Sequence, residues 1–158
     1  MDPVSQGAIG ATFAVATIRR KKVASIALIG AVAGLAPDVD VFFQSASDPL
    51  LFLEYHRQFT HSLIFIPVGA LIVALLARFL LRPDLDLRTI YLSALAGYAT
   101  HGLLDSFTSY GTQLFWPFSD YRVAWDNISI VDPLFTLPLL CLLYTSDAAD
   151  EEDSVDLG

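Results

Sequence analysis

The stretch that decides the fold is LIFIPVGALIVALLARFLL, residues 63–81, in which Arg78 is the single charged residue among nineteen. An α-helix rises about 1.5 Å per residue, so nineteen residues cover most of the roughly 30 Å of hydrocarbon in a bilayer. We therefore predict a membrane-spanning helix over these residues.

Other apolar stretches surround it. Residues 4–18 and 23–36 are rich in Ala and Gly, and residues 89–104 contain Gly97 and end in polar groups. Each is shorter than a comfortable span, which favours tilted, short or re-entrant helices packed closely through small residues. A fifth apolar segment begins at residue 133. The expected fold class is all-α, an integral membrane bundle of about four to five apolar helices, truncated at the C-terminus.

The composition supports a membrane protein whose body is nearly neutral. Of the 158 residues, 54% are hydrophobic and only 16% are charged, against about 25% charged in soluble domains. The net charge of -8 is concentrated at one end, because residues 141–158 contain six acidic residues and no Lys or Arg. The remaining 11 acidic and 9 basic residues argue against a nucleic-acid partner held by a basic surface. The expected partner is the lipid bilayer.

The basic residues predict an orientation. One cluster lies at residues 19–22, after the first apolar stretch, which favours a cytoplasmic loop over a cleaved signal peptide. A second group consists of Arg78, Arg82 and Arg88. If both are cytoplasmic, residues 37–40, 56–62 and 101–105 all lie at the opposite, non-cytoplasmic face of the membrane.

Those three segments carry the polar side chains that point to chemistry. Asp38 and Asp40 follow an apolar stretch and Pro37, which is typical of a helix end but also of paired oxygen ligands. His56 and His61 precede residues 63–81, with one expected in a turn and the other near a helix start.

The third segment pairs a histidine with a carboxylate. His101 and Asp105 are four residues apart and share one helical face. Asp105 could bind a metal directly or orient His101 by accepting its ring N–H.

All three histidines of the chain lie in these segments, which favours a metal site over polar residues that only pair with one another. His and Asp ligands suit Zn, Mn or Fe. The candidate metal ligands are Asp38, Asp40, His56, His61, His101 and Asp105. Six ligands exceed one tetrahedral shell, so either two metals share the site or some residues only orient the ligands.

Residues 106–119 are polar and then aromatic. This pattern is typical of the membrane interface, and the alternative is a lid or a groove for an acyl chain or headgroup with Arg122 as a phosphate contact.

The motifs taken together resemble a known family. They are Pro-Asp-Val-Asp (37–40), His-Arg-Gln-Phe-Thr-His-Ser (56–62), His-Gly-Leu-Leu-Asp (101–105), Thr-Ser-Tyr-Gly-Thr (108–112), Trp-Pro-Phe (116–118) and Val-Asp-Pro (131–133). The combination is similar to the YdjM-like family of membrane-bound, predicted metal-dependent hydrolases, some described as LexA-regulated inner-membrane proteins. The resemblance covers residues 1–140 as one membrane-embedded domain. It implies metal binding by the six residues above, with Arg57 and Thr60 as supporting catalytic groups. Many members have a His near the start, where this chain has Gln6.

The remainder differs in character. Residues 141–151, CLLYTSDAADE, resemble one translated frame of a transposase-type sequencing adaptor. We expect residues 141–158 to be a disordered, non-native read-through, with a natural acidic tail as the alternative.

The expected function is a metal-dependent hydrolase of a bacterial or archaeal cytoplasmic membrane. Metal-activated water would attack an ester or phosphoester, possible substrates including lipids, while Arg57 stabilises the developing negative charge. The alternative is a non-enzymatic membrane protein that binds or conducts an ion or proton through the same His and Asp residues.

Overall fold

The computed structural model describes residues 1–18, 22–42, 55–81 and 83–155, and this part of the chain is helical. The elements are α1 (Pro3–Thr17), α2 (Val23–Leu35), the 3-10 helices η1 (Ala36–Phe42) and η2 (Phe59–His61), α4 (Ile66–Leu80), α5 (Leu87–Ser106) and α6 (Pro133–Val155). Pairing of extended backbone in these ranges is limited to one isolated bridge between Thr112 and Val123. The all-α class predicted from the sequence is confirmed.

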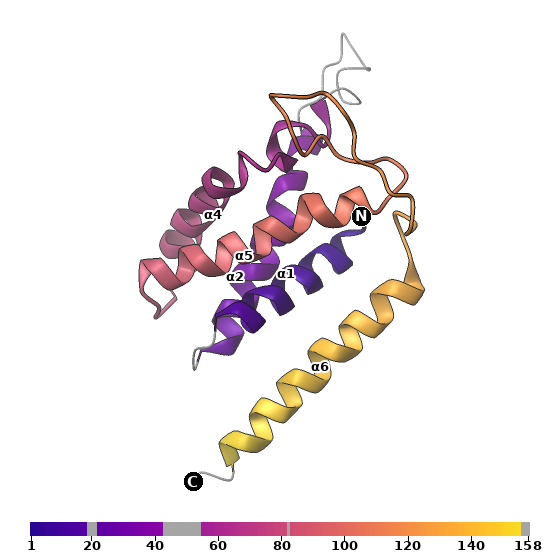
Figure 1. Cartoon of the computed structure of the whole chain (residues 1–158). Coiled ribbons are helices and arrows are strands. Elements are labelled where there is room, and N and C mark those ends of the chain that lie inside the picture. The colour runs from indigo at the N-terminus through magenta and orange to yellow at the C-terminus, as the bar shows by residue number, and fades with distance from the viewer. Residues whose placement is uncertain (19–21, 43–54, 82, 156–158) are drawn as a thin grey trace.

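Helices α1, α2, α4 and α5 pack into one bundle, while α6 extends away from it on the side of α1 (Figure 1). Two aspartates begin bundle helices by capping them. Asp2 accepts a hydrogen bond from the Ser5 N–H at the start of α1, and Asp86 accepts one from the Thr89 N–H at the start of α5. The segment between α5 and α6 covers the end of the bundle where the N-terminus lies.

Glycines allow the helices of the bundle to approach closely. A Cβ atom placed on Gly97 of α5 would lie 2.2 Å from the carbonyl oxygen of Gly30 in α2. One placed on Gly10 of α1 would lie 2.5 Å from the same oxygen. Three helices therefore meet around Gly30 with no room for a methyl group between them.

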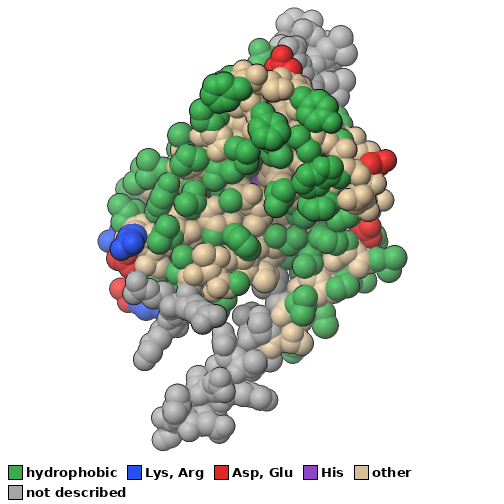
Figure 2. All heavy atoms as spheres, in the orientation of Figure 1, with side chains coloured by type: hydrophobic (Ala, Val, Ile, Leu, Met, Phe, Trp, Pro, Cys, Tyr) green, Lys and Arg blue, Asp and Glu red, His purple; other side chains and the backbone are tan. Residues whose placement is uncertain are grey.

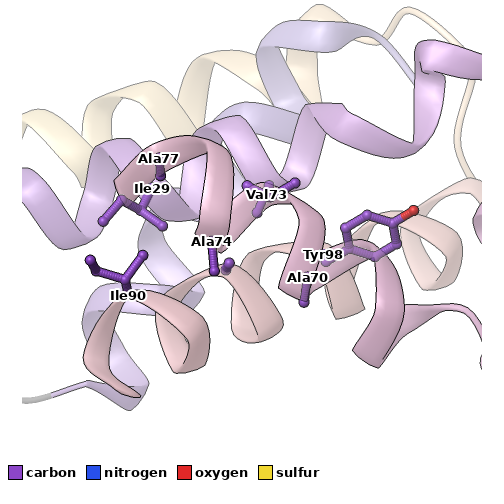
Figure 3. Close-up of a cluster of buried hydrophobic side chains, with 9 residues drawn as sticks. Ile29, Ala70, Val73, Ala74, Ala77, Ile90 and Tyr98 are labelled. Atoms are coloured by element: carbon purple, nitrogen blue, oxygen red, sulfur yellow. The ribbon is translucent and has the colours of Figure 1, made fainter. Parts of the chain in front are cut away.

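The core between α2, α4 and α5 is built mostly from small side chains (Figure 3). Its larger members are Ile29, Val73, Ile90 and Tyr98, and the rest are alanines. The opposite face of α4 exposes Leu71, Leu75 and Phe79 among other large apolar residues. Figure 2 shows one face of the molecule covered mostly by hydrophobic side chains, with charged groups at its edges. Such a surface suits lipid better than water.

The structure corrects the expected lengths of two apolar segments. Helix α4 has 15 residues and begins at Ile66, because in a helix that began at residue 63 Pro67 could not donate a hydrogen bond to the Leu63 carbonyl and its ring would clash with that carbonyl. Helical backbone instead continues from α2 through Pro37, which lies near the start of η1, where a proline is tolerated.

Within the described residues, one helical segment is long and apolar enough to cross a membrane. It is Val23–Phe42, with 20 residues and a mean hydropathy of 1.6. Ile66–Leu80 and Pro133–Leu142 are shorter apolar helices. Helix α6 continues to Val155, and the non-native origin of residues 141–158 stays a prediction.

Candidate metal centre

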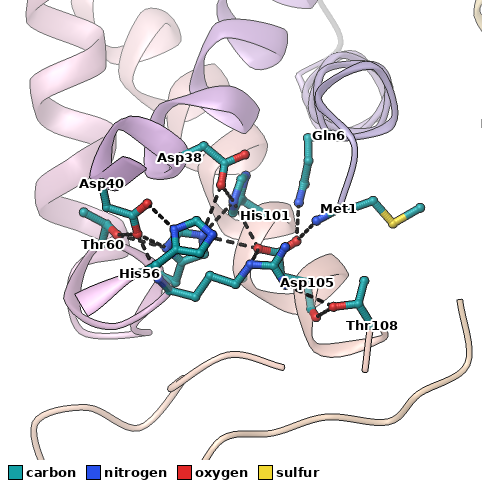
Figure 4. A network of polar contacts seen from close by, with 12 residues as sticks. Met1, Gln6, Asp38, Asp40, His56, Thr60, His101, Asp105 and Thr108 are labelled. Atoms are coloured by element: carbon teal, nitrogen blue, oxygen red, sulfur yellow. Dashed lines mark hydrogen bonds and ion pairs between the residues drawn. The ribbon is translucent and has the colours of Figure 1, made fainter. Parts of the chain in front are cut away.

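The three polar motifs meet in one buried network at the end of the bundle that holds the N-terminus (Figure 4). Asp38 and Asp40 come from η1, His61 comes from η2, and His101 and Asp105 come from one face of α5. Residues separated by more than 60 positions are thereby brought within contact distance.

Four ligand atoms form a compact inner group, and they belong to Asp38, His61, His101 and Asp105. The two histidine Nε2 atoms lie 2.9 Å apart. Asp38 Oδ1 lies 3.6 Å from His61 Nε2 and 3.3 Å from His101 Nε2, and Asp105 Oδ2 lies 3.3 Å and 3.5 Å from the same atoms. A tetrahedral Zn²⁺ site with bonds of about 2.0–2.1 Å has edges of about 3.3–3.4 Å. The inner group therefore has the dimensions of a tetrahedral coordination shell.

Both inner histidine rings are held through Nδ1, the ring nitrogen that points away from the inner group. His101 Nδ1 contacts the carbonyl oxygen of Gly34, and His61 Nδ1 lies 2.9 Å from Thr60 Oγ1 and 3.3 Å from Asp40 Oδ2. A carbonyl or carboxylate that accepts the Nδ1–H fixes the tautomer whose Nε2 carries the lone pair for a metal. Gly34 and Asp40 therefore orient the histidines toward the inner group.

Asp40 also belongs to an outer group, with Asp38 and His56. Its Oδ2 accepts hydrogen bonds from the Arg57 N–H and the Thr60 hydroxyl, both at 2.9 Å. Its Oδ1 lies 2.7 Å from His56 Nδ1. The side chains of His56 and Asp38 are 14% and 27% exposed, whereas that of Asp40 is fully buried. The outer group thus lies on the more accessible side of the network.

The surroundings of the Asp105 carboxylate show that the site suits a cation. Its Oδ1 accepts hydrogen bonds from the Met1 ammonium group and from Gln6 Nε2, the latter at 2.9 Å. Its Oδ2 is buried, lies 3.0 Å from Arg57 Nε and faces the Nε2 atoms of His61 and His101 at 3.3 Å and 3.5 Å. A buried carboxylate oxygen that faces two imidazole nitrogens in this way is placed to bind a cation together with them.

Arg57 is held at the centre of the network by its backbone and its side chain. Its φ of 62° places it in the left-handed region, which is unusual for a residue other than glycine. The Arg57 carbonyl accepts from the Gln113 N–H (3.1 Å), and Nη1 donates to Thr108 Oγ1 (3.0 Å). The guanidinium also lies over the Tyr110 ring, 5.1 Å from its centroid. The strained backbone thus turns a buried positive charge toward Asp105.

The carboxylates control the charge of His61. Burial by itself lowers the pKa of this imidazole, but hydrogen bonds to Asp105, Asp38 and Asp40 outweigh it and raise the pKa from 6.5 to about 10. His61 is therefore a positively charged imidazolium at neutral pH in the metal-free protein. A metal that binds Nε2 has to displace the proton on that nitrogen.

All six candidate ligands from the sequence lie in this network, and both proposed supporting residues contact it. Thr60 bonds to Asp40, and Arg57 pairs with Asp105. Gly34 was not identified from the sequence as a partner of His101, because a backbone carbonyl leaves no residue-type signal. Its small size was the available clue, since a Cβ there would lie 2.7 Å from the Gln6 carbonyl oxygen.

Comparison with known proteins agrees with the motifs. The model of the family described as YdjM inner membrane protein matches residues 1–155. Over 117 residues the chain is 30% identical to the uncharacterized protein YfhP of Bacillus subtilis (strain 168), a match that covers 73% of this chain. The same match covers 35% of YfhP, so the chain spans about a third of that relative's length. No solved structure gives a significant match.

Proposed function

The chain belongs to the YdjM inner membrane protein family, and on that premise we propose that it is a membrane-bound, metal-dependent hydrolase of esters or phosphoesters. The observation that carries the proposal is the inner group of Asp38, His61, His101 and Asp105, whose spacing matches a tetrahedral shell. A divalent ion held by the network of six candidate ligands, Zn, Mn or Fe, would supply a water of lowered pKa and a Lewis acid.

The protein's own residues hold and complete the site. Gly34 and Asp40 direct the Nε2 atoms of the two histidines inward, and Thr60 fixes Asp40 through its hydroxyl. Arg57 places a positive charge beside Asp105 that stabilises negative charge developing on a substrate. Thr60 thus acts through Asp40, whereas Arg57 acts on the substrate.

The membrane arrangement is part of the proposal. In this proposal α1, α5 and the shorter apolar helices Ile66–Leu80 and Pro133–Leu142 complete a bundle of four to five membrane helices around the Val23–Phe42 span. The exposed apolar face of α4 supports this arrangement. The basic residues beyond α1 and α4 support an orientation with those ends in the cytoplasm and the metal centre at the other face.

A lipid substrate is supported by an apolar groove that is lined in part by η1, the 3-10 helix that carries Asp38. The groove has a volume of about 420 Å³ and lies between α2 and α4. Ala36 and Val39 line it, and both belong to the 3-10 helix that carries Asp38. An acyl chain in this groove would bring a headgroup ester next to the candidate metal centre.

The test uses the full chain in detergent with bis(p-nitrophenyl) phosphate, p-nitrophenyl phosphate and p-nitrophenyl butyrate as probes. Hydrolysis is expected to stop after treatment with a chelator and to return with Zn²⁺ or Mn²⁺. His61→Ala should remain folded and inactive, while Gln58→Ala, a neighbouring change outside the contacts described above, should retain activity. Hydrolysis that survives complete metal removal would contradict the proposal.

A second candidate function is supported by the continuous chain of titratable groups. His56, Asp40 and His61 are linked by contacts of 2.7 Å and 3.3 Å, and His61 contacts His101 at 2.9 Å. Such a chain in a membrane protein suits ion or proton conduction. Ion flux in liposomes without hydrolysis of any probe would favour this function over the hydrolase.

A further inference from the structure

The network contains two ligand groups that share one residue. The inner group combines Asp38 with His61, His101 and Asp105, and the outer group combines Asp38 with Asp40 and His56. We propose that the outer group binds a second divalent cation, with Asp38 as a shared ligand, and that the second ion carries the open coordination position for water and substrate. This inference rests on the metal site proposed above.

The inner group alone has the character of a closed site. It offers four protein ligands, and the side chains of His61, His101 and Asp105 are fully buried. Tetrahedral zinc with four protein ligands is typical of structural sites, whereas catalytic sites hold three protein ligands and leave one position open. An ion in the inner group therefore has no vacant tetrahedral position for water.

The outer group has the complementary properties. It offers three protein ligands, and two of them, Asp38 and His56, are partly exposed. Asp40 divides its two oxygens between separate tasks. Its Oδ2 holds the Arg57 N–H and Thr60 hydroxyl, while Oδ1 faces His56. Asp40 can therefore offer Oδ1 to an ion and keep the contacts that position it.

Asp38 is placed to serve both ions. Its Oδ1 contacts both inner histidines, and the residue also lies within ligand distance of Asp40 and His56. A carboxylate has two oxygens and can give one to each of two metals. Paired ions in two-metal hydrolases lie about 3.5–4 Å apart and hold the attacking and leaving oxygens between them.

The charges of the site indicate which substrate class suits a pair of ions. The site holds three carboxylates: Asp105 pairs with Arg57 and the Met1 ammonium group, and Asp38 and Asp40 contact His61. With neutral histidines, two divalent ions leave the site clearly positive. An anionic phosphoester offsets that charge, whereas an uncharged carboxylic ester does not. The two-ion site therefore favours phosphoesters.

The experiment measures metal stoichiometry on the full chain in detergent, saturated with Mn²⁺ and freed of excess ion by gel filtration. We expect two ions per chain in the wild type and in Gln58→Ala, and one in His56→Gln. One ion in both the wild type and His56→Gln would overturn the second site but leave the proposed metal centre intact. No bound ion in any of the proteins would overturn both.

A measurement on the wild type alone covers the case in which His56→Gln does not fold. Two Mn²⁺ ions that share Asp38 should give a spin-coupled electron paramagnetic resonance spectrum at saturation. The six-line signal of isolated Mn²⁺ at saturation would contradict the shared site. The same probes used for activity should show at least tenfold preference for bis(p-nitrophenyl) phosphate over p-nitrophenyl butyrate in kcat/KM, and the reverse preference would overturn the assigned substrate class.

Discussion

The Nε2 atoms of His61 and His101 face each other at 2.9 Å, although the residues lie 40 positions apart on η2 and α5. Their ring planes are inclined by 69°, with centroids 4.6 Å apart, and each ring is held through Nδ1 on its far side. Two imidazoles fixed in this way present both Nε2 atoms to one position, where a metal that displaces the proton of His61 would find half of its ligands in place.

Removing one of these rings should weaken metal binding strongly. Replacing a residue that only orients a ligand typically costs 10–100-fold in affinity, so His101→Ala, which removes a ligand, should cost about 100-fold or more. Competition with a chromophoric chelator measures this change. Thr100→Ala is the matched control, because Thr100 bonds only to the Gly97 carbonyl of its own helix; an equal loss in both variants would contradict the role of His101.

Thr60 should act through its hydroxyl. The hydroxyl donates to Asp40 and lies beside His61 Nδ1, so Thr60→Val should weaken metal binding by about tenfold. Thr60→Ser keeps the hydroxyl and should restore affinity to within about threefold of wild type. If the serine variant binds metal as weakly as the valine variant, the loss reflects packing and the hydroxyl has no such role.

Metal affinity should increase with pH through the neutral range. The pKa of His61 is raised to about 10, so below that pH a metal competes with a bound proton, and above it the competition ends. Displacement of one proton makes the affinity rise about tenfold per pH unit between pH 7 and 9. Isothermal titration calorimetry in buffers of different ionisation enthalpy measures the released proton. Affinity that does not change over this range would contradict the protonated state of His61.

The close helix contact at Gly97 should make that position sensitive to a single methyl group. Alanine usually stabilises a helix by about 0.5–1 kcal/mol relative to glycine. At Gly97, however, the added Cβ meets the Gly30 carbonyl oxygen at 2.2 Å, and overpacking costs about 1–3 kcal/mol. The cost of overpacking exceeds the gain in helix propensity, so Gly97→Ala should lower the unfolding temperature.

Gly7→Ala is the control for that substitution. A Cβ on Gly7 lies 3.8 Å from Leu35 Cδ1, an ordinary contact. This variant should unfold at or slightly above the wild-type temperature in circular dichroism melts. Equal melting temperatures for the two variants would show that the α2–α5 contact is looser than described.

The positions of the helices were largely predictable from apolar stretches. Residues 4–18 correspond to α1 (Pro3–Thr17) within one residue at each end. The prediction for residues 63–81 was wrong at its start, because Pro67 is tolerated in the first turn of a helix but not farther inside it, so the helix begins at Ile66. Hydropathy alone gives no weight to this proline, although the residue is visible in the sequence.

That the three polar motifs meet was predictable from the sequence, whereas the contacts between their side chains were not. The two groups of basic residues predicted that the three motifs share one face of the membrane, opposite the basic residues. The separate tasks of the two Asp40 oxygens depend on the backbone of Arg57, whose positive φ aims its N–H at Oδ2. An arginine in the left-handed region has no sequence signature, so the hydrogen bond that occupies Asp40 Oδ2 could not be predicted. The sequence therefore left open which residues bind a metal and which only orient the ligands.

X-ray absorption at the zinc edge of the zinc-loaded full chain tests the metal centre most directly. We expect nitrogen and oxygen ligands at about 2.0–2.1 Å, with the scattering pattern of imidazole rings. That pattern should decrease in His61→Ala and disappear when His56, His61 and His101 are all replaced by alanine. A wild-type spectrum with oxygen ligands only, unchanged by these substitutions, would contradict a metal held by the histidines.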